Sequence, residues 1–136
     1  MKTDRPFFDT NVLLYLLSED NRKADRAEAI ITMGGIISVQ VLNEFSSVAS
    51  RKLKMTYAEI RDALSIVKAV CHTQPVTINT HELGLDIAER FGFSLYDSMI
   101  VSAALQSGCT ILYSEDMQHG QVIDAQLVIT NPFPDT

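Results

Sequence analysis

Four acidic residues of this chain stand at positions where charge is usually avoided. They are Asp9, Glu44, Asp97 and Asp116. The first and last follow short apolar runs, whereas the middle two lie beside apolar residues that recur at helical spacing. Carboxylates are rarely buried unless they are paired or bind a cation. The pattern therefore predicts one acidic site assembled from distant segments.

Such a site needs a counter-charge. Two carboxylates about 5 Å apart repel each other by roughly 3 kcal/mol at an effective dielectric constant of 20. No lysine or arginine lies within three residues of Glu44, Asp97 or Asp116. A divalent cation that prefers oxygen ligands, Mg²⁺ or Mn²⁺, is the natural partner of these acids.

Each acid also has a purely structural explanation. Asp9 is suited to cap a short helix, and Asp97 follows Ser94 at the third position of a helix, where a carboxylate favours the helix terminus. Glu44 could reach solvent from the edge of its apolar stripe. Asp116 could belong to a polar loop, and the neighbouring Glu115 competes with it because adjacent side chains diverge.

The elements that must position these acids alternate between strands and helices. The expected strands are short and rich in Ile and Val, without polar alternation, which favours a parallel sheet buried by helices on both faces. The fold class is therefore α/β, and ligands are expected outside the carboxyl ends of its strands. Strands are expected at 6–9, 36–37, 76–78, 110–113 and 127–130, and helices at 12–17, 22–32, 39–54, 56–70, 79–91 and 94–106.

Helix-terminal residues support these boundaries. Ser38 and Ser94 are expected N-caps, and Thr56 with Glu59 forms a capping-box pattern. We expect the same pattern from Asn79 with Glu82.

Length and composition limit the class of protein. A chain of 136 residues predicts a single domain, 1–136. The net charge of −6 argues against a protein that holds nucleic acid mainly by a basic surface. No apolar stretch approaches a membrane span, and the run at 12–17 is too short for a signal peptide, so we expect a cytoplasmic protein. Cys71 and Cys109, far apart in sequence, are expected to be reduced thiols.

Four segments of the sequence stand out together. They are FFDTNVLLY at 7–15, SVQVLNEF at 38–45, FSLYDSMIVSAAL at 93–105 and TILYSEDMQHG at 110–120. In this order they resemble PIN-domain proteins of the VapC type, the toxin ribonucleases of toxin–antitoxin pairs. The resemblance runs nearly from end to end. It implies a PIN-like fold with a parallel five-stranded sheet, which agrees with the pattern of elements.

The resemblance also implies a function. Asp9, Glu44, Asp97 and Asp116 would be the catalytic and metal-binding acids, with Asp116 preferred to Glu115, and Thr10, Asn11 and Ser114 would support them. The implied protein is an endoribonuclease that hydrolyses phosphodiester bonds in single-stranded RNA with Mg²⁺ or Mn²⁺. It would form a homodimer and be held inactive by a cognate antitoxin.

Basic residues near these acids are candidates for RNA binding. Arg51, Lys52 and Lys54 form the densest basic group, and a second lies at 22–26, although both could be solvated helix faces. Two other functions stay open. Asp9-Thr10-Asn11 after an apolar strand is also compatible with an Asp-nucleophile phosphohydrolase, and the chain could be a catalytically silent module that binds RNA or metal.

Overall fold

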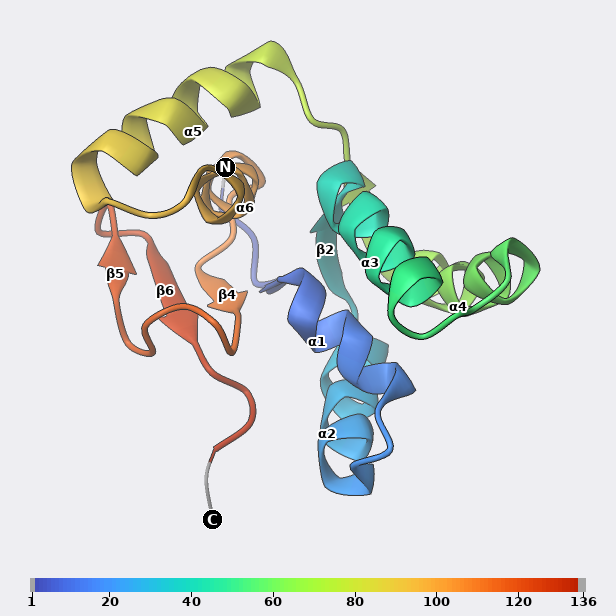
Figure 1. Cartoon of the computed structure of the whole chain (residues 1–136). Coiled ribbons are helices and arrows are strands. Elements are labelled where there is room, and N and C mark those ends of the chain that lie inside the picture. Colours follow the sequence, from blue (N-terminus) through green and yellow to red (C-terminus); the bar gives the residue numbers. More distant parts are fainter. Residues whose placement is uncertain (1, 135–136) are drawn as a thin grey trace.

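A central sheet of six strands organises the molecule (Figure 1). The structure is a computed structural model, and it describes residues 2–134. The strands lie in the order β3-β2-β1-β4-β6-β5, and every neighbouring pair is parallel except β5 with β6. The strands are β1 (Phe7–Phe8), β2 (Gly35–Ser38), β3 (Cys71–Gln74), β4 (Ile111–Tyr113), β5 (Val122–Ile123) and β6 (Leu127–Thr130).

The helices connect these parallel strands. Their bounds are α1 (Thr10–Leu14), the short 3₁₀ helix η1 (Tyr15–Leu17), α2 (Asn21–Thr32), α3 (Val39–Arg51), α4 (Tyr57–Val70), α5 (Ile78–Phe91) and α6 (Leu95–Gln106). The chain runs outward through β1, β2 and β3, then returns to add β4 beside β1. Because parallel crossovers are right-handed, this reversal places α5 and α6 on the opposite face from α1 to α4. Figure 1 shows α6 on one side of β2 and α3 on the other.

The reversal also fixes where a ligand can bind. In open parallel sheets, the crevice forms outside the carboxyl ends of the two strands between which the strand order reverses. Here these strands are β1 and β4, which pair through Phe7 with Leu112 and Phe8 with Tyr113. Asp9 directly follows the first strand and Ser114 directly follows the second. The expected α/β fold, with a mostly parallel sheet, is confirmed.

The third strand lies earlier in the sequence than predicted. We expected it at 76–78, but it spans Cys71–Gln74 and pairs with β2 at the edge of the sheet. Only Cys71 of this strand is buried. An edge strand does not need an apolar run, so the search for one selected Val76 and Ile78, which are 44% and 75% exposed.

The following helix also starts earlier than predicted. Thr77, not Asn79, is the N-cap of α5: its hydroxyl accepts a hydrogen bond from Thr80 N at 3.2 Å, and the Thr80 hydroxyl accepts one from Thr77 N at 3.1 Å. Sequence patterning overlooked this capping box because its third residue is Thr instead of Glu or Gln. The predicted box of Thr56 with Glu59 at the start of α4 is confirmed.

The sheet contains one strand more than the five expected. The strand β5 is two residues long and antiparallel to β6 at the far edge. A tight turn joins the two strands, with positive φ angles of 53° at Asp124 and 55° at Ala125. Such turns usually contain Gly or Asn at these positions, so Asp-Ala gives little sequence signal.

Gly35 allows β1 and β2 to approach each other. A Cβ atom at this position would lie 2.7 Å from the Pro6 carbonyl oxygen and 2.4 Å from Cε2 of Phe8. The backbone of Ile36 donates a hydrogen bond to that same carbonyl at 2.8 Å. The absence of a side chain at Gly35 therefore positions the strand that leads into Asp9.

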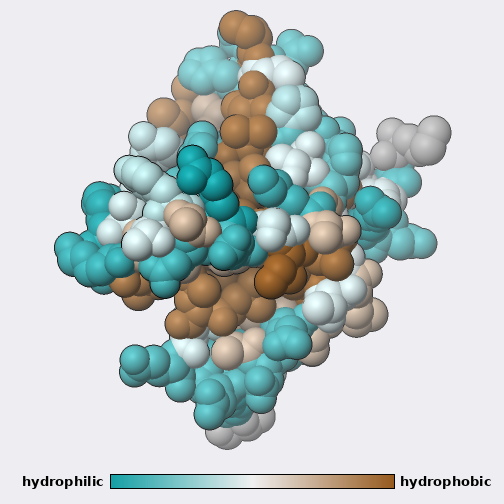
Figure 2. Space-filling view, turned by 90° about the vertical axis from the view of Figure 1, so that its right-hand side faces the viewer, coloured by the Kyte–Doolittle hydropathy of each residue, from teal (hydrophilic) through white to brown (hydrophobic). Residues whose placement is uncertain are grey.

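Apolar residues form one buried cluster, and some remain on the surface. Figure 2 views the right-hand side of Figure 1, where α3 and α4 lie, and shows bands of apolar surface between polar side chains. Ile66 and Val70 of α4 are among the large apolar side chains left uncovered. No helix within residues 2–134 is long and apolar enough to cross a membrane.

Candidate active site

Four separate elements bring the acids to the carboxyl edge of the sheet. Asp9 is the N-cap of α1 immediately after β1, and Asp116 lies in the loop after β4. Glu44 lies in the second turn of α3, whose N-cap Ser38 ends β2. Asp97 lies in the first turn of α6, where its backbone N–H donates to the N-cap Ser94 at 3.1 Å.

Asp9 is buried, and both of its carboxylate oxygens accept hydrogen bonds. One of its carboxylate oxygens accepts from the backbone of Thr10 at 2.7 Å. The other accepts from the hydroxyl of Ser114 at 2.8 Å and from the amide of Asn11 at 3.3 Å. Ser114 also accepts from the backbone of Met117 at 3.3 Å, which fixes its hydroxyl proton toward Asp9. The carboxylate is thus held in one orientation at the junction of β1 and β4.

Burial and like charge act together on this carboxyl group. Burial, with smaller contributions from the negative charges of Asp97 and Glu44, raises the pKa of Asp9 from 3.8 to about 6. The hydrogen bonds from Ser114 and Thr10 act in the opposite direction. Burial, followed by the charge of Asp116, also raises the pKa of Asp97. Asp9 therefore lies close enough to Asp97 and Glu44, and Asp97 close enough to Asp116, for their charges to interact.

Asn11 joins the two acids that follow neighbouring strands. Its side-chain amide donates to Asp9 at 3.3 Å and to Asp116 at 3.1 Å, while its carbonyl oxygen accepts from the backbone of Glu115 at 3.2 Å. A single side chain thus sets the position of the loop after β4 relative to β1. The side chain of Glu115 points elsewhere: it accepts from the hydroxyl of Tyr15 and forms an ion pair with Lys23.

Glu44 is held from two sides. Gln40, one helical turn earlier, donates to one carboxylate oxygen at 2.7 Å and also to the backbone carbonyl of Tyr96 at 3.2 Å. Thr10 donates to the other oxygen at 3.4 Å. The i, i+4 spacing of Gln40 and Glu44 was visible in the sequence and could have revealed this contact. The contact to Tyr96 links α3 to the start of α6.

These acids have no basic partner. None of the three ion pairs between described residues includes Asp9, Glu44, Asp97 or Asp116. As they stand, no three His, Cys, Asp or Glu side chains within residues 2–134 lie close enough to enclose one metal ion. Mg²⁺ does not need such a cage, because it usually binds one or two carboxylates and keeps several waters. The donor set and its uncompensated charge fit a hydrated divalent cation.

Two hollows lie beside α3; the lining of the first includes Glu44, and that of the second includes Asn11, which contacts Asp9 and Asp116. The first, of about 530 Å³, is lined by Gln40, Asn43, Glu44, Ser47, Val48, Arg51 and Tyr96. The second, of about 320 Å³, is lined by Asn11, Leu14, Tyr15, Leu17, Ser18, Val48, Lys52 and Leu53. The two share Val48, and each has one basic residue of the group expected to bind RNA. The third member of that group, Lys54, lines neither hollow.

In the second basic group, the side chains of Lys23 and Arg26 make structural contacts. Lys23 contacts Tyr15 and Glu115, and Nε of Arg26 donates to the backbone carbonyl of Pro132 at 3.0 Å. The backbone of Arg22 donates to Asp20, the N-cap of α2, at 3.1 Å. No sequence signal linked Lys23 to Glu115, because the two are 92 residues apart.

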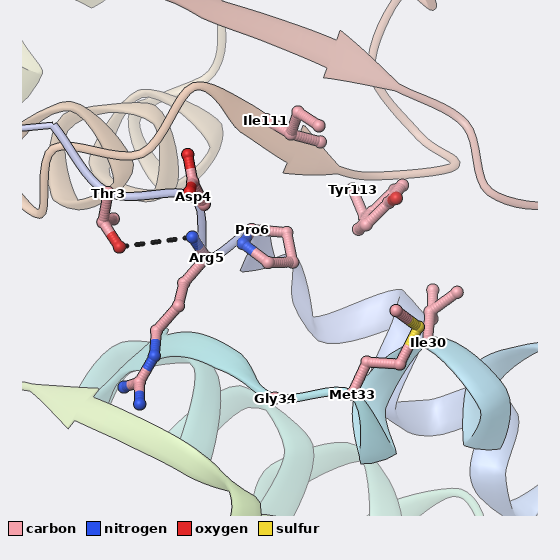
Figure 3. A pocket seen from close by; sticks show the side chains of 9 residues that line it. All are labelled: Thr3, Asp4, Arg5, Pro6, Ile30, Met33, Gly34, Ile111 and Tyr113. Carbon is pink, nitrogen blue, oxygen red and sulfur yellow. Dashed lines mark hydrogen bonds between the residues drawn. The ribbon is translucent and has the colours of Figure 1, made fainter.

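A further hollow, of about 490 Å³, contains none of the four acids (Figure 3). It lies between the amino-terminal segment, the end of α2 and β4, and its lining includes Arg5, Pro6, Met33, Ile111 and Tyr113. In Figure 3 the side chain of Arg5 points away from Ile111 and Tyr113. Besides Arg5, its polar lining side chains are Thr3, Asp4 and Tyr113, and the rest of the lining is mostly apolar.

The fold agrees with the comparison to known families. The PIN domain model matches residues 7–123, and the chain belongs to the PIN domain family. No protein with curated annotation is a significant match.

Solved structures share this fold at low sequence identity. The chain superposes on VapC20 of Mycobacterium tuberculosis, described as a sarcin-ricin loop cleaving toxin, with a TM-score of 0.67 and 18% identity over 82% of this chain and 89% of that one. A toxin–antitoxin complex from Klebsiella pneumoniae matches with a TM-score of 0.71 and 17% identity, over 94% of this chain and 98% of that one. VapBC2 from Rickettsia felis, bound to a promoter DNA fragment, matches with a TM-score of 0.66 and 18% identity, over 93% of this chain and 97% of that one. The architecture is therefore that of VapC-type PIN domains.

Proposed function

We propose that this protein is the toxin of a toxin–antitoxin pair and acts as a divalent-metal-dependent endoribonuclease in the cytoplasm. The observation that carries the proposal is the cluster of four acids without a basic partner, at the point where the strand order of a PIN fold reverses. Solved structures with the same fold are described as an RNA-cleaving toxin and as toxin–antitoxin complexes. The reaction is hydrolysis of a phosphodiester bond in single-stranded RNA.

The metal ion of this proposal is Mg²⁺ or Mn²⁺. We assign Asp9 and Asp97 as its main ligands, because burial, with a smaller contribution from the charge of neighbouring acids, raises the pKa of both, and a bound cation would stabilise their charged forms. Glu44 and Asp116 complete the site or orient its waters. When bound, such a cation polarises water and phosphate oxygens.

Residues of the chain hold these acids in position. Ser114, Asn11 and Thr10 hold Asp9 in one orientation, and Gln40 holds Glu44. Groups of this kind, which orient the ligands of a metal, typically affect metal affinity or activity by about 10- to 100-fold. These groups donate hydrogen bonds to carboxylate oxygens, each of which has two lone pairs and could also bind a cation.

The proposed partners are RNA, an antitoxin and a second copy of the chain. Arg51 and Lys52 line the two hollows beside the acids and suit a phosphate backbone. The exposed apolar side chains of α4 suit an amphipathic helix of an antitoxin.

The experiment is cleavage of single-stranded RNA by purified protein with Mg²⁺, Mn²⁺ or EDTA. Asp9→Asn and Asp97→Asn are expected to lose cleavage by at least about 100-fold. Glu115→Gln is the matched control, because that carboxylate pairs with Lys23. Cleavage that survives in EDTA, or in either Asp→Asn variant, would disprove this mechanism.

The same purified protein also tests the two other candidate functions. An Asp-nucleophile phosphohydrolase would form an aspartyl-phosphate on Asp9, which trapping and mass spectrometry would detect. In the described residues, the hydrogen bonds to this carboxylate come from Thr10, Asn11 and Ser114, and none comes from a lysine. RNA binding without cleavage under every metal condition would favour a silent binding module.

A further inference from the structure

The hollow between α3 and the start of α6 has the composition of a nucleotide-binding site. It combines one guanidinium, one aromatic ring, two side-chain amides and a hydroxyl with the carboxylate of Glu44. Its volume of about 530 Å³ lies within the range of small-ligand sites. We propose that it is a subsite for one unpaired nucleotide of the RNA, next to the cleaved phosphodiester. This inference rests on the proposed function and names how the substrate is held.

Tyr96 supplies the surface for a base. It lines the hollow, it is 68% exposed, and it directly precedes Asp97 in the chain. Gln40 donates a hydrogen bond to its backbone carbonyl at 3.2 Å, which fixes this residue against α3. Unpaired RNA bases are typically bound by stacking on exposed aromatic rings, and stacking does not require a particular base.

Arg51 supplies the charge for a phosphate. Its Nε donates to the hydroxyl of Ser47 at 3.0 Å, so the guanidinium is held at the wall of the hollow while the residue stays exposed. Guanidinium groups bind phosphate oxygens through paired N–H donors. Glu44, in the same wall, belongs to the acidic cluster, so a nucleotide held here places its phosphate beside the metal-binding acids.

Asn43 and Ser47 make the hollow selective for a polar ligand. Both lie on the same side of α3 as Glu44 and Arg51 and line the hollow with them. An amide and a hydroxyl can hydrogen bond to the edge of an unpaired base or to a ribose hydroxyl. Double-stranded RNA keeps its bases stacked and paired, so it cannot place one on Tyr96.

A fluorescence experiment tests the subsite directly. The chain contains no tryptophan, so Tyr96→Trp introduces a single indole at the proposed stacking surface. Combined with Asp116→Asn to slow cleavage, and with Mg²⁺ present, this variant is titrated with a single-stranded RNA decamer and with the same sequence as a duplex. We expect saturable quenching by the single strand and little quenching by the duplex. The matched control is Tyr57→Trp on α4, a residue that is 70% exposed and lines none of the hollows described.

Kinetics supply the second test. Tyr96→Ala is expected to raise KM for single-stranded RNA by about 5- to 100-fold with a smaller change in kcat, whereas Tyr96→Phe keeps the ring and stays close to wild type. Arg51→Gln is expected to weaken binding for all sequences and to reduce the slope of log K against log salt concentration by about 1. Arg61→Gln on α4 is the matched control, because Arg61 is also an exposed arginine and lines neither hollow beside α3.

The outcomes separate the subsite from the proposed function. Quenching that is equal for the two introduced indoles, or equal for single strand and duplex, overturns the subsite. So does a wild-type KM in Tyr96→Ala. If the wild-type protein cleaves no RNA, the nuclease proposal fails, yet the fluorescence titration still decides whether a nucleotide binds here.

Discussion

The ammonium group of Lys23 lies 2.8 Å from Oε2 of Glu115, and this ion pair distinguishes two neighbouring acids. Glu115 is held toward α2 and Tyr15, while Asp116 accepts a hydrogen bond from Asn11 on the side of Asp9. The loop after β4 is thus fixed by opposite contacts on adjacent residues.

This relationship predicts different consequences for the two acids. Asp116→Asn is expected to lower kcat for RNA by about 100-fold or more, because it removes a charge from the acidic cluster. Glu115→Gln is expected to change kcat by less than about threefold, because its role is positional. Steady-state cleavage assays of both variants check this. The reverse order would assign Glu115 as the fourth acid.

Ser114→Ala tests the support of the buried carboxylate. The variant removes the 2.8 Å hydrogen bond to Asp9 and the acceptor for Met117 N, so we expect a loss of about 1–3 kcal/mol in the free energy of unfolding. We also expect about 10- to 100-fold weaker Mg²⁺ binding. Urea unfolding and calorimetric Mg²⁺ titration measure the two effects. Ser102→Ala, whose buried hydroxyl donates to the Thr80 carbonyl, is the control: it should affect stability alone.

The raised pKa of Asp9 predicts how stability depends on pH. Because the folded chain binds this proton more tightly than the unfolded chain, the contribution of Asp9 to stability is fully present below about pH 4. It is lost as the pH rises through about 6, and the loss amounts to about 3 kcal/mol without divalent metal. The difference in unfolding free energy between wild type and Asp9→Asn, measured from pH 4 to pH 7, gives the pH-dependent contribution of Asp9. A difference that does not change with pH would contradict it.

Metal binding should oppose that loss. A cation that binds only the folded chain adds about 2.7 kcal/mol to the free energy of unfolding at 100 times its Kd. We therefore expect Mg²⁺ to raise the Tm of the wild type at pH 7 and to flatten the pH dependence, with neither effect in Asp9→Asn. Thermal scans with MgCl₂, compared with NaCl at equal ionic strength, separate specific binding from screening.

Gly35→Ala tests the approach of β1 to β2. The added Cβ would lie 2.7 Å from the Pro6 carbonyl oxygen, which is backbone and cannot move alone. We expect destabilisation of about 1–3 kcal/mol from overpacking. Gly84→Ala is the comparison: its Cβ would meet the flexible end of Met99, so a smaller loss is expected. Urea denaturation of both variants ranks them, and an equal loss would contradict the explanation.

Sequence patterns predicted much of this molecule for a physical reason. Central strands such as β1 and β4 need apolar runs, and parallel topology brings their carboxyl ends together, so local spacing was enough to group Asp9 with Asp116. Glu44 and Asp97 were selected because an acid beside an apolar helical stripe is unusual. The position of the edge strand β3 was predicted wrongly because only Cys71 is buried, and β5 was not predicted because its turn contains neither Gly nor Asn.

The contacts that position the acids were harder to predict. Lys23 with Glu115 and Gln40 with the Tyr96 carbonyl join segments far apart in the chain, and neither pairing leaves a local pattern. The positions of the basic residues 51, 52 and 54 relative to the site were equally hard to predict from the sequence. Composition grouped them, but only the geometry of α3 and the loop after it places Arg51 and Lys52 beside hollows and Lys54 away from them.

The pairing of β1 with β4 also determines when the site can exist during synthesis. Asp9 leaves the ribosome 105 residues before its hydrogen-bond donor Ser114. A nascent chain therefore carries an incomplete set of acids until the segment with Ser114 and Asp116 has been made and β4 can pair with β1. If the chain is the proposed ribonuclease, its activity can begin only after that pairing.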